Sequence, residues 1–237
     1  MKIGVITAMT REFRQVAGLL AHPSESAAGP FVITTGAVGN GEVVLMASGI
    51  GKVNAALGAA ALIRAFQPDC IVSTGVAGGL DPCLAVMDVV AGREVVYHDV
   101  DCGPGNVRGQ VQGLPPRFAC DSRLLAAACG LASPVRIHAG LIASGDRFIS
   151  DGQDLAAIKA AFPEALAVDM ESGAIAQTCH LFGVPFLAFR IVSDVPGAKD
   201  HYAGYENFWE TMADRSFSVT RLLLEALGAV PPSADHR

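Results

Sequence analysis

The chain has 237 residues, of which 51% are hydrophobic and 17% charged, and its formal net charge at pH 7 is −6. A charged fraction below the roughly 25% of an average globular protein excludes a disordered chain and allows a large buried core. The negative charge, without any cluster of Lys or Arg, argues against a nucleic-acid partner, because phosphate backbones are held by basic patches.

Apolar stretches and cysteines indicate the compartment. The longest apolar runs, such as residues 55–63, are far shorter than the roughly 20 residues that a membrane span needs. Arg11, Glu12 and Arg14 interrupt the segment in which a signal peptide would be apolar. We expect a cytoplasmic protein with no membrane partner and no cofactor. The six cysteines lack CxxC spacing and are expected to be free thiols that bind no metal.

Apolar runs of strand length alternate with segments of helical length, which is typical of a layered α/β fold. Strands are expected at residues 2–6, 31–38, 42–48, 69–74, 88–97, 136–143, 165–168 and 184–192. Helices are expected at residues 9–20, 52–66, 122–129, 152–161, 171–182 and 205–227. The pattern therefore predicts a sheet covered by helices on both faces.

A turn near the N-terminus predicts that this sheet is mixed. Gly39, Asn40 and Gly41 separate the second and third expected strands, and these residue types tolerate the positive φ of a tight hairpin. We expect a single three-layer α/β domain over residues 1–230, with a central twisted mixed β-sheet flanked by helices. Residues 231–237 are expected to form a disordered tail.

The longest segment without a pattern covers residues 98–118 and contains four glycines and three prolines. It is expected to be a surface loop. Loops of this length in compact domains usually serve function or assembly.

Polar residues follow apolar strands at several places, where ligands bind in α/β sheets. These places are residues 9–12, 48–52, 74–79, 169–171, and 190 with 193–194. Two of them are glycine-rich turns, SGIGKV and TGVAGG, but neither has the spacing of a Walker A loop or of GxGxxG. They could be tight turns or could contact a ligand.

Three carboxylates, Glu12, Glu171 and Asp194, each lie just past an expected strand. Singly, each could be a helix cap or a solvated turn residue. Together with Arg190, which shares a strand with Asp194, they predict one acidic cleft.

Several of these segments, taken together, resemble those of a known family. The segments MKIGVITAM with Glu12, SGIGKVNAALG, TG-x-AGGL, YHDVD, SGDRFI, AVDMESGAIA and FRIVSDV occur in the order and spacing of the 5′-methylthioadenosine/S-adenosylhomocysteine nucleosidases, nearly end to end. This family belongs to the nucleoside phosphorylase/hydrolase superfamily. The resemblance implies that fold, a homodimer whose pocket is completed by the partner's residues 98–118, and hydrolysis of an adenosine derivative to adenine.

The resemblance also implies roles for individual residues. Cleavage of an N-ribosidic bond needs an acid for the purine and a base for water. By similarity, Asp194 would protonate adenine N7, Glu12 would activate water with support from Arg190, and Glu171 would hold the ribose hydroxyls. The other expected substrate contacts are Met9, Ile50, Val76, Ala77, Gly78, Phe148, Ile149, Met170, Ser193 and Tyr205.

Three departures from the family pattern leave alternatives open. Val76 replaces the usual Ser or Thr, residues 98–118 lack the usual aromatic residue, and Tyr202 and Tyr205 stand near the position of a family phenylalanine. A phosphate-dependent purine nucleoside phosphorylase would share the fold, but Glu12 would repel phosphate. A hydrolase of another adenosine derivative, such as aminofutalosine, and a non-catalytic nucleoside-binding protein are the remaining alternatives.

Overall fold

The computed structural model describes residues 1–195, 206, 208–209 and 217–231. The strands are β1 (Lys2–Thr7), β2 (Ala21–Ala28), β3 (Phe31–Val38), β4 (Gly41–Ala47), β5 (Cys70–Gly79), β6 (Val89–Tyr97), β7 (Phe118–Ala119), β8 (Ile137–Ser144), β9 (Ala165–Asp169) and β10 (Phe186–Asp194). The helices are α1 (Thr10–Ala17), α2 (Lys52–Phe66), α3 (Ser122–Cys129), α4 (Gly152–Ala161), α5 (Ser172–Phe182) and α8 (Ser218–Gly228).

The sheet combines a closed part and an open part. Strands β10, β6, β8, β9 and β5 pair in that order, and β10 also pairs with β5, so these strands close into a ring. From β5 the sheet continues outward through β1, β4 and β3 to β2. Parallel and antiparallel pairs both occur, and β3 and β4 form the hairpin expected from Gly39-Asn40-Gly41. The predicted mixed sheet is confirmed.

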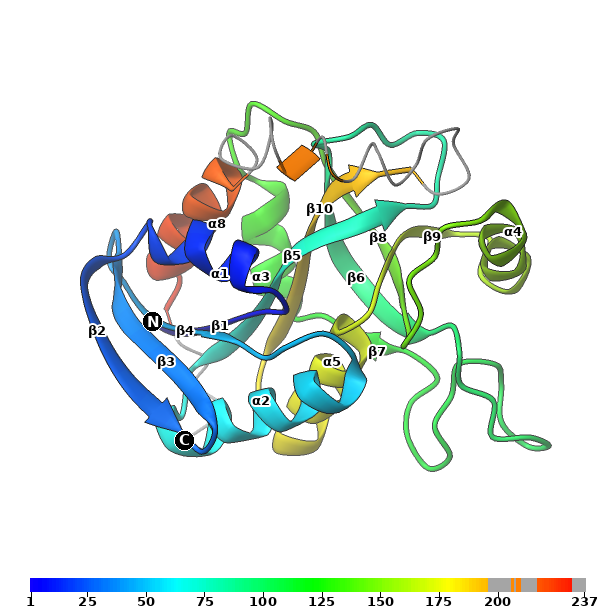
Figure 1. Ribbon diagram of the computed structural model, residues 1–237, viewed down its shortest axis with the longest axis horizontal. Coiled ribbons are helices and arrows are strands. Elements are labelled where there is room, and N and C mark those ends of the chain that lie inside the picture. Colours follow the sequence, from blue (N-terminus) through cyan, green and yellow to red (C-terminus); the bar gives the residue numbers. More distant parts are fainter. Residues whose placement is uncertain (196–205, 207, 210–216, 232–237) are drawn as a thin grey trace.

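Helices flank this sheet as predicted (Figure 1). Helices α2 and α5 pack against each other on one side, and α1, α3 and α8 cover the other side. The strands between them are lined by fully buried apolar side chains such as Leu45, Ile71 and Phe189. Among the described residues, no helix is long and apolar enough to cross a membrane.

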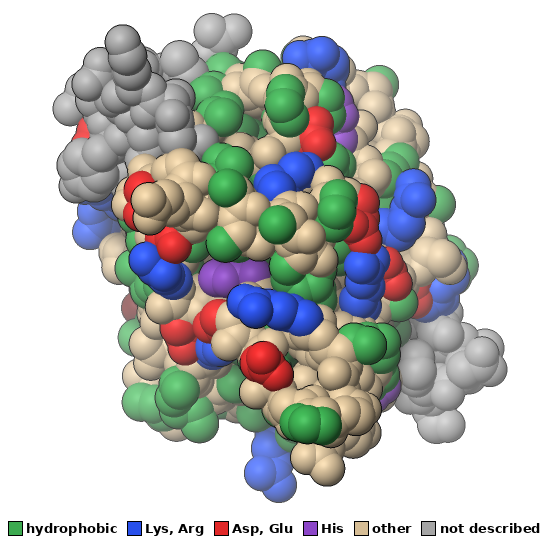
Figure 2. Space-filling model, turned by 90° about the vertical axis from the view of Figure 1, so that its right-hand side faces the viewer, with side chains coloured by type: hydrophobic (Ala, Val, Ile, Leu, Met, Phe, Trp, Pro, Cys, Tyr) green, Lys and Arg blue, Asp and Glu red, His purple; other side chains and the backbone are tan. Residues whose placement is uncertain are grey.

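Residues 98–117 contain neither helix nor strand, as expected, and the segment projects from the body at the lower right of Figure 1. Figure 2 faces this side of the molecule and shows acidic and basic side chains intermixed over it.

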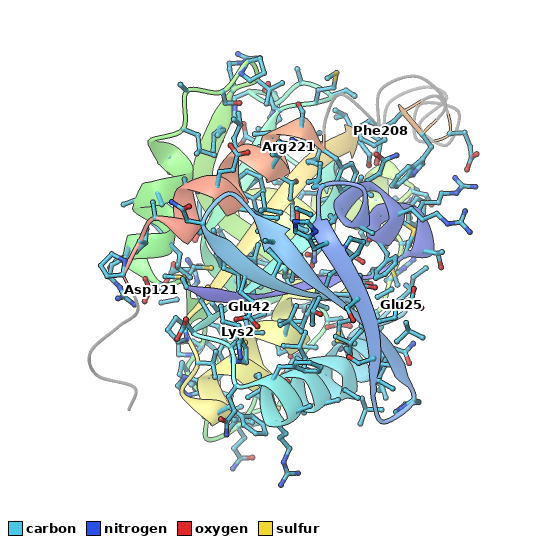
Figure 3. The ribbon with its side chains drawn as sticks, turned by 90° about the vertical axis from the view of Figure 1, so that its left-hand side faces the viewer. Lys2, Glu25, Glu42, Asp121, Phe208 and Arg221 are labelled. Carbon is cyan, nitrogen blue, oxygen red and sulfur yellow. The ribbon has the colours of Figure 1, made fainter. Side chains whose placement is uncertain are left out.

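The sequence prediction missed β2, because its residues, AHPSESAA, show no apolar alternation. The strand lies at the end of the sheet and is mostly exposed, so only backbone pairing with β3 defines it. Figure 3 looks onto this edge, with Glu25 labelled.

Other boundaries also differ from the prediction. TGVAGG is not a turn: β5 continues through it to Gly79, because residues 74–78 pair with β10 and Gly78 and Gly79 pair with β9. Helix α1 ends at Ala17 rather than at residue 20, with Gly18 as its C-cap. Of the helix expected at residues 205–227, the described C-terminal part is α8, and Tyr202 and Tyr205 lie outside the described residues.

Candidate active site

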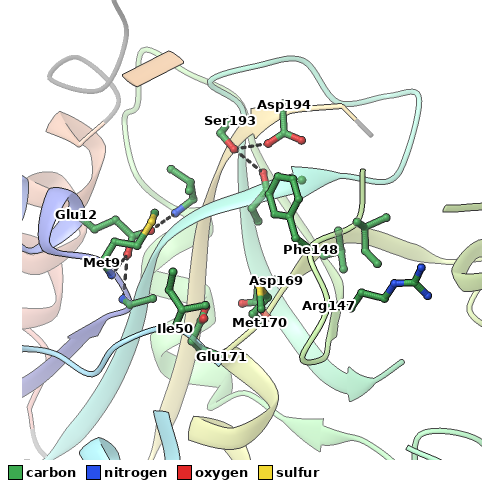
Figure 4. Close-up of a pocket in the computed structure, with 16 residues that line it drawn as sticks. Met9, Glu12, Ile50, Arg147, Phe148, Asp169, Met170, Glu171, Ser193 and Asp194 are labelled. Atoms are coloured by element: carbon green, nitrogen blue, oxygen red, sulfur yellow. Dashed lines mark hydrogen bonds between the residues drawn. The ribbon is translucent and has the colours of Figure 1, made fainter. Parts of the chain in front are cut away.

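A pocket opens where β1, β5, β9 and β10 end, and sixteen residues line it (Figure 4). Twelve of the residues predicted from sequence are among them: Met9, Glu12, Ile50, Val76, Ala77, Gly78, Phe148, Ile149, Met170, Glu171, Ser193 and Asp194. Glu12 and Asp194 come from opposite sides of the pocket in Figure 4. Arg190 is buried and is not among the lining residues, and Tyr205 is outside the described residues.

Glu12 is held by backbone amides. It lies in the first turn of α1, and its Oε2 accepts hydrogen bonds from the amides of Ala8 and Met9, both at 2.9 Å. Its Oε1 accepts a third from the amide of Val76 at 2.9 Å. Burial raises the pKa of Glu12, while the charge of Arg190 and these three amides act in the opposite direction. The result is a fixed carboxylate with increased basicity.

Arg190 lies on β10 and is only 1% exposed. Its Nε lies 2.6 Å from Asp169 Oδ2, and its Nη2 donates to Ser73 Oγ at 2.7 Å and to Ser172 Oγ at 3.1 Å. A buried guanidinium needs such partners, because desolvation of an unpaired charge is costly. Nearby carboxylates, Asp169 foremost, raise its pKa despite burial, so it stays charged.

Glu171 lies at the N-cap position of α5 and connects this helix to α2. Its Oε1 accepts a hydrogen bond from the amide of Gly51 at 2.9 Å, and the next amide, of Lys52, donates to Asp146 Oδ1 at 2.7 Å. Two carboxylates therefore cap the N-terminus of α2, where free amides would otherwise attract an anion. Burial raises the pKa of Glu171 to about 7, although Arg190 opposes this shift.

Asp194 ends β10 and is 4% exposed. Ser193 Oγ lies 2.5 Å from Asp194 Oδ1 and 3.4 Å from the carbonyl oxygen of Ala77 (Figure 4). The hydroxyl therefore orients the carboxyl group of Asp194 at the pocket wall.

The pocket also has an apolar, exposed rim. Phe148 is 47% exposed and Ile50 is 52% exposed, whereas Ile149 next to Phe148 is buried. The segment that carries Phe148 is anchored through Asp146, whose amide donates to Asp99 Oδ2 at 2.9 Å. An exposed ring at a pocket mouth can stack on a planar ligand.

Sequence reasoning missed several contributors. Ala8, Arg147 and Val168 line the pocket, and Ser73 and Ser172 contact Arg190. Asp169 falls within the candidate segment 169–171 but was given no role of its own; it lines the pocket and pairs with Arg190. Its place directly after a strand was the available signal, whereas nothing local distinguishes Ser73. In the part of the chain that the structure describes, no group of three His, Cys, Asp or Glu side chains is placed to hold a metal ion.

Comparison with known proteins identifies the family. A family model described as the phosphorylase superfamily matches residues 2–227. A 5′-methylthioadenosine/S-adenosylhomocysteine nucleosidase of Actinobacillus succinogenes is 43% identical over 232 residues, which cover 96% of this chain and 100% of that protein.

Solved structures agree with this match. The nucleosidase of that name from Neisseria meningitidis, in complex with methylthio-immucillin-A, is 39% identical with a TM-score of 0.90 and covers 95% of this chain and 99% of its own. The one from Colwellia psychrerythraea, in complex with adenine, is 38% identical with a TM-score of 0.91 and covers 97% of each chain. The chain therefore belongs to the 5′-methylthioadenosine/S-adenosylhomocysteine nucleosidase family of the phosphorylase superfamily.

Proposed function

We propose that this protein hydrolyses the N-ribosidic bond of 5′-methylthioadenosine, S-adenosylhomocysteine or a related adenosine derivative and releases adenine. The names of its relatives and the adenine in the Colwellia psychrerythraea structure support the substrate class. The observation that carries hydrolysis is that carboxylates of the chain itself occupy the backbone amides around the pocket.

These occupied amides oppose phosphorolysis. A phosphorylase must bind a phosphate dianion, for which backbone amides at turns and helix starts are the usual donors. Here the amides of Ala8, Met9 and Val76 donate to Glu12, and that of Gly51 donates to Glu171. A phosphate dianion would have to lose its hydration shell and displace these carboxylates from the amides, or bind next to their negative charges. A neutral water molecule meets no such repulsion.

In the proposed mechanism, Asp194 donates a proton to the purine as the C–N bond breaks, and the sugar acquires oxocarbenium character. Glu12 takes a proton from the attacking water on the other side of the pocket. The increased pKa of Glu12 makes it a stronger base than a solvated glutamate, and Arg190 keeps it ionised. Glu171 accepts hydrogen bonds from the ribose hydroxyls, Met170 packs on the sugar, and Phe148 and Ile149 hold the base.

We also propose a homodimer in which residues 98–118 of the partner complete the pocket. In this structure the chain's own residues 98–118 do not line the pocket. Ile50, Val53 and Leu57 form an exposed apolar row beside the pocket at the start of α2, with exposed fractions of 52%, 70% and 58%. Residues 98–118 begin beside the same helix start, where Asp99 Oδ2 lies 2.8 Å from Lys52 Nζ, so a second copy that buried this row would bring its own segment close to the rim. A monomeric mass in solution together with full activity would contradict this assembly.

One assay tests the function. Adenine release from 5′-methylthioadenosine is measured with and without inorganic phosphate, and formation of 5-methylthioribose and of 5-methylthioribose 1-phosphate is followed in parallel. Release that is independent of phosphate is expected. Release only with phosphate would show a phosphorylase, and nucleoside binding without release would show a non-catalytic binding protein. Parallel assays with S-adenosylhomocysteine and aminofutalosine rank the substrates.

A further inference from the structure

The buried guanidinium of Arg190 is held on two of its three nitrogen atoms. Nε pairs with Asp169 Oδ2 at 2.6 Å and also donates to Ser172 Oγ at 3.2 Å. Nη2 donates to Ser73 Oγ at 2.7 Å and to Ser172 Oγ at 3.1 Å. An arginine has five N–H donors, and among the described residues no hydrogen-bond acceptor is assigned to the two on Nη1.

Nη1 faces Glu12 across Gly75. A Cβ added to Gly75 would lie 2.8 Å from Nη1 of Arg190 and would also collide with Oε1 of Glu12. The two groups are therefore separated by little more than this missing side chain. Gly75 has a φ of 149°, so a larger residue would be strained there as well.

The charges around Glu12 make the orientation of Arg190 important. Among the described residues, Arg190 on β10 is the cation that faces Glu12, while Glu171 at the start of α5 is a second carboxylate nearby. Asp194 and Asp169 line the same pocket, and Asp169 also pairs with Arg190. A buried carboxylate beside others stays ionised only if a cation is fixed close to it.

Asp169 alone cannot fix this orientation. It contacts Nε, near the point about which the guanidinium group rotates, and leaves the two Nη atoms able to move. The hydroxyls of Ser172 and Ser73 both meet Nη2, and both side chains are fully buried. They determine where Nη2 lies, and because the guanidinium is planar they also determine where Nη1 lies.

We propose that Ser172, together with Ser73, is a positioning residue that acts through Arg190: the two hydroxyls aim Nη1 at Glu12 and so keep the base of the proposed hydrolysis ionised at neutral pH. This inference rests on the proposed function. Removal of one hydroxyl leaves the guanidinium charged but less well fixed, which weakens its effect on Glu12.

The test is the pH profile of kcat/KM for Ser172→Ala and Ser73→Ala against the wild type. With Arg190 loosened, the pKa of Glu12 rises further, so the acidic limb of the profile is expected to move up by about 0.5–1 pH unit. Above the new limb, kcat/KM returns to near the wild-type value. The double variant is expected to shift by less than the sum of the single shifts, because both hydroxyls act through one group.

Thr178→Val is the matched control, because this buried hydroxyl on the same helix donates to the carbonyl of Ala174 at 2.8 Å and does not contact Arg190. Its profile is expected to match the wild type. An equal loss of kcat/KM at every pH in the serine variants, or an unmoved limb, would overturn the proposal.

A second measurement separates this inference from the function. The carboxyl ¹³C resonance of Glu12, assigned with Glu12→Gln, is titrated in the wild type and in Ser172→Ala, which requires no turnover. A higher midpoint in Ser172→Ala supports the positioning role even if the wild type releases no adenine. Equal midpoints refute it even if the wild type is an active nucleosidase.

Discussion

The inner end and the rim of the pocket are built differently. At the inner end, Glu12 and Arg190 are each 1% exposed, and backbone amides and serine hydroxyls hold them. At the rim, Phe148 and Ile50 are about half exposed and make mainly apolar surface. The chain therefore fixes the groups to which we assign the reaction, whereas the rim side chains, to which we assign contacts with the base, are less constrained. This difference implies that turnover and substrate preference can be changed separately.

Replacing Asp194 by Asn gives the largest effect expected at the inner end. The amide keeps the shape and a hydrogen bond to the purine but cannot deliver a proton in the transition state. We expect kcat to fall by about 10²- to 10⁴-fold with a much smaller change in KM. Steady-state kinetics of adenine release measures both constants. A variant with near wild-type kcat would show that Asp194 is not the acid.

The increased pKa of Glu171 makes the free energy of unfolding depend on pH. Its pKa is about 7 in the folded protein against 4.5 for an ordinary glutamate, so its contribution is fully present below pH 4.5 and is lost as pH rises through 7. Glu171→Gln cannot ionise, so its free energy of unfolding relative to the wild type should increase by about 2–3 kcal/mol between pH 5 and pH 8.

Urea unfolding at the two pH values measures this difference. Glu25→Gln carries the same substitution at an exposed position on strand β2 and is the control for the change of residue type. A difference between Glu171→Gln and the wild type that does not change with pH would contradict the increased pKa of Glu171.

Val53→Asp tests whether a second copy completes the rim of the pocket. It places a charge in the exposed row of Ile50, Val53 and Leu57, which the proposed dimer buries. We expect a monomer in light scattering and a KM raised about tenfold, equivalent to about 1.4 kcal/mol of lost binding. Val32→Asp is the control, because Val32 is similarly exposed at 59% but lies on β3. If Val53→Asp is monomeric and retains the wild-type KM, the partner does not complete the pocket.

The smallest effect is expected at Val76, where the side chain departs from the family pattern. Its amide binds Glu12 whatever the side chain is, so the base stays in place. Val76→Ser adds a hydroxyl that can help to hold water, worth about 0.5–1.5 kcal/mol, and should raise kcat by about tenfold at most. The rate should remain independent of phosphate. A rate that climbs steeply in a phosphate titration would indicate a phosphorolytic site.

The sequence predicted the site residues where a polar side chain directly follows an apolar run of strand length. Polar residues after apolar strands located Glu12, Glu171 and Asp194 in one pocket, because neighbouring strand ends meet at one edge of a sheet. It was not informative for Ser73, whose contact with Arg190 depends on the pairing of β5 with β10. Local pattern also failed for β2, since an exposed edge strand needs no apolar alternation. Both failures concern residues whose structure is decided by distant neighbours.

The exposed strand β2 has a consequence for how copies of this chain can associate. An edge strand can template strand addition from another chain and start a fibril. Pro23 offers no N–H for such pairing, His22 has a φ of 52°, and the register shifts between Ala21 and Ser24. This edge is therefore irregular and interrupted, with the charge of Glu25 beyond it. An edge of this kind disfavours open-ended strand addition between copies, which is compatible with the closed pair proposed above.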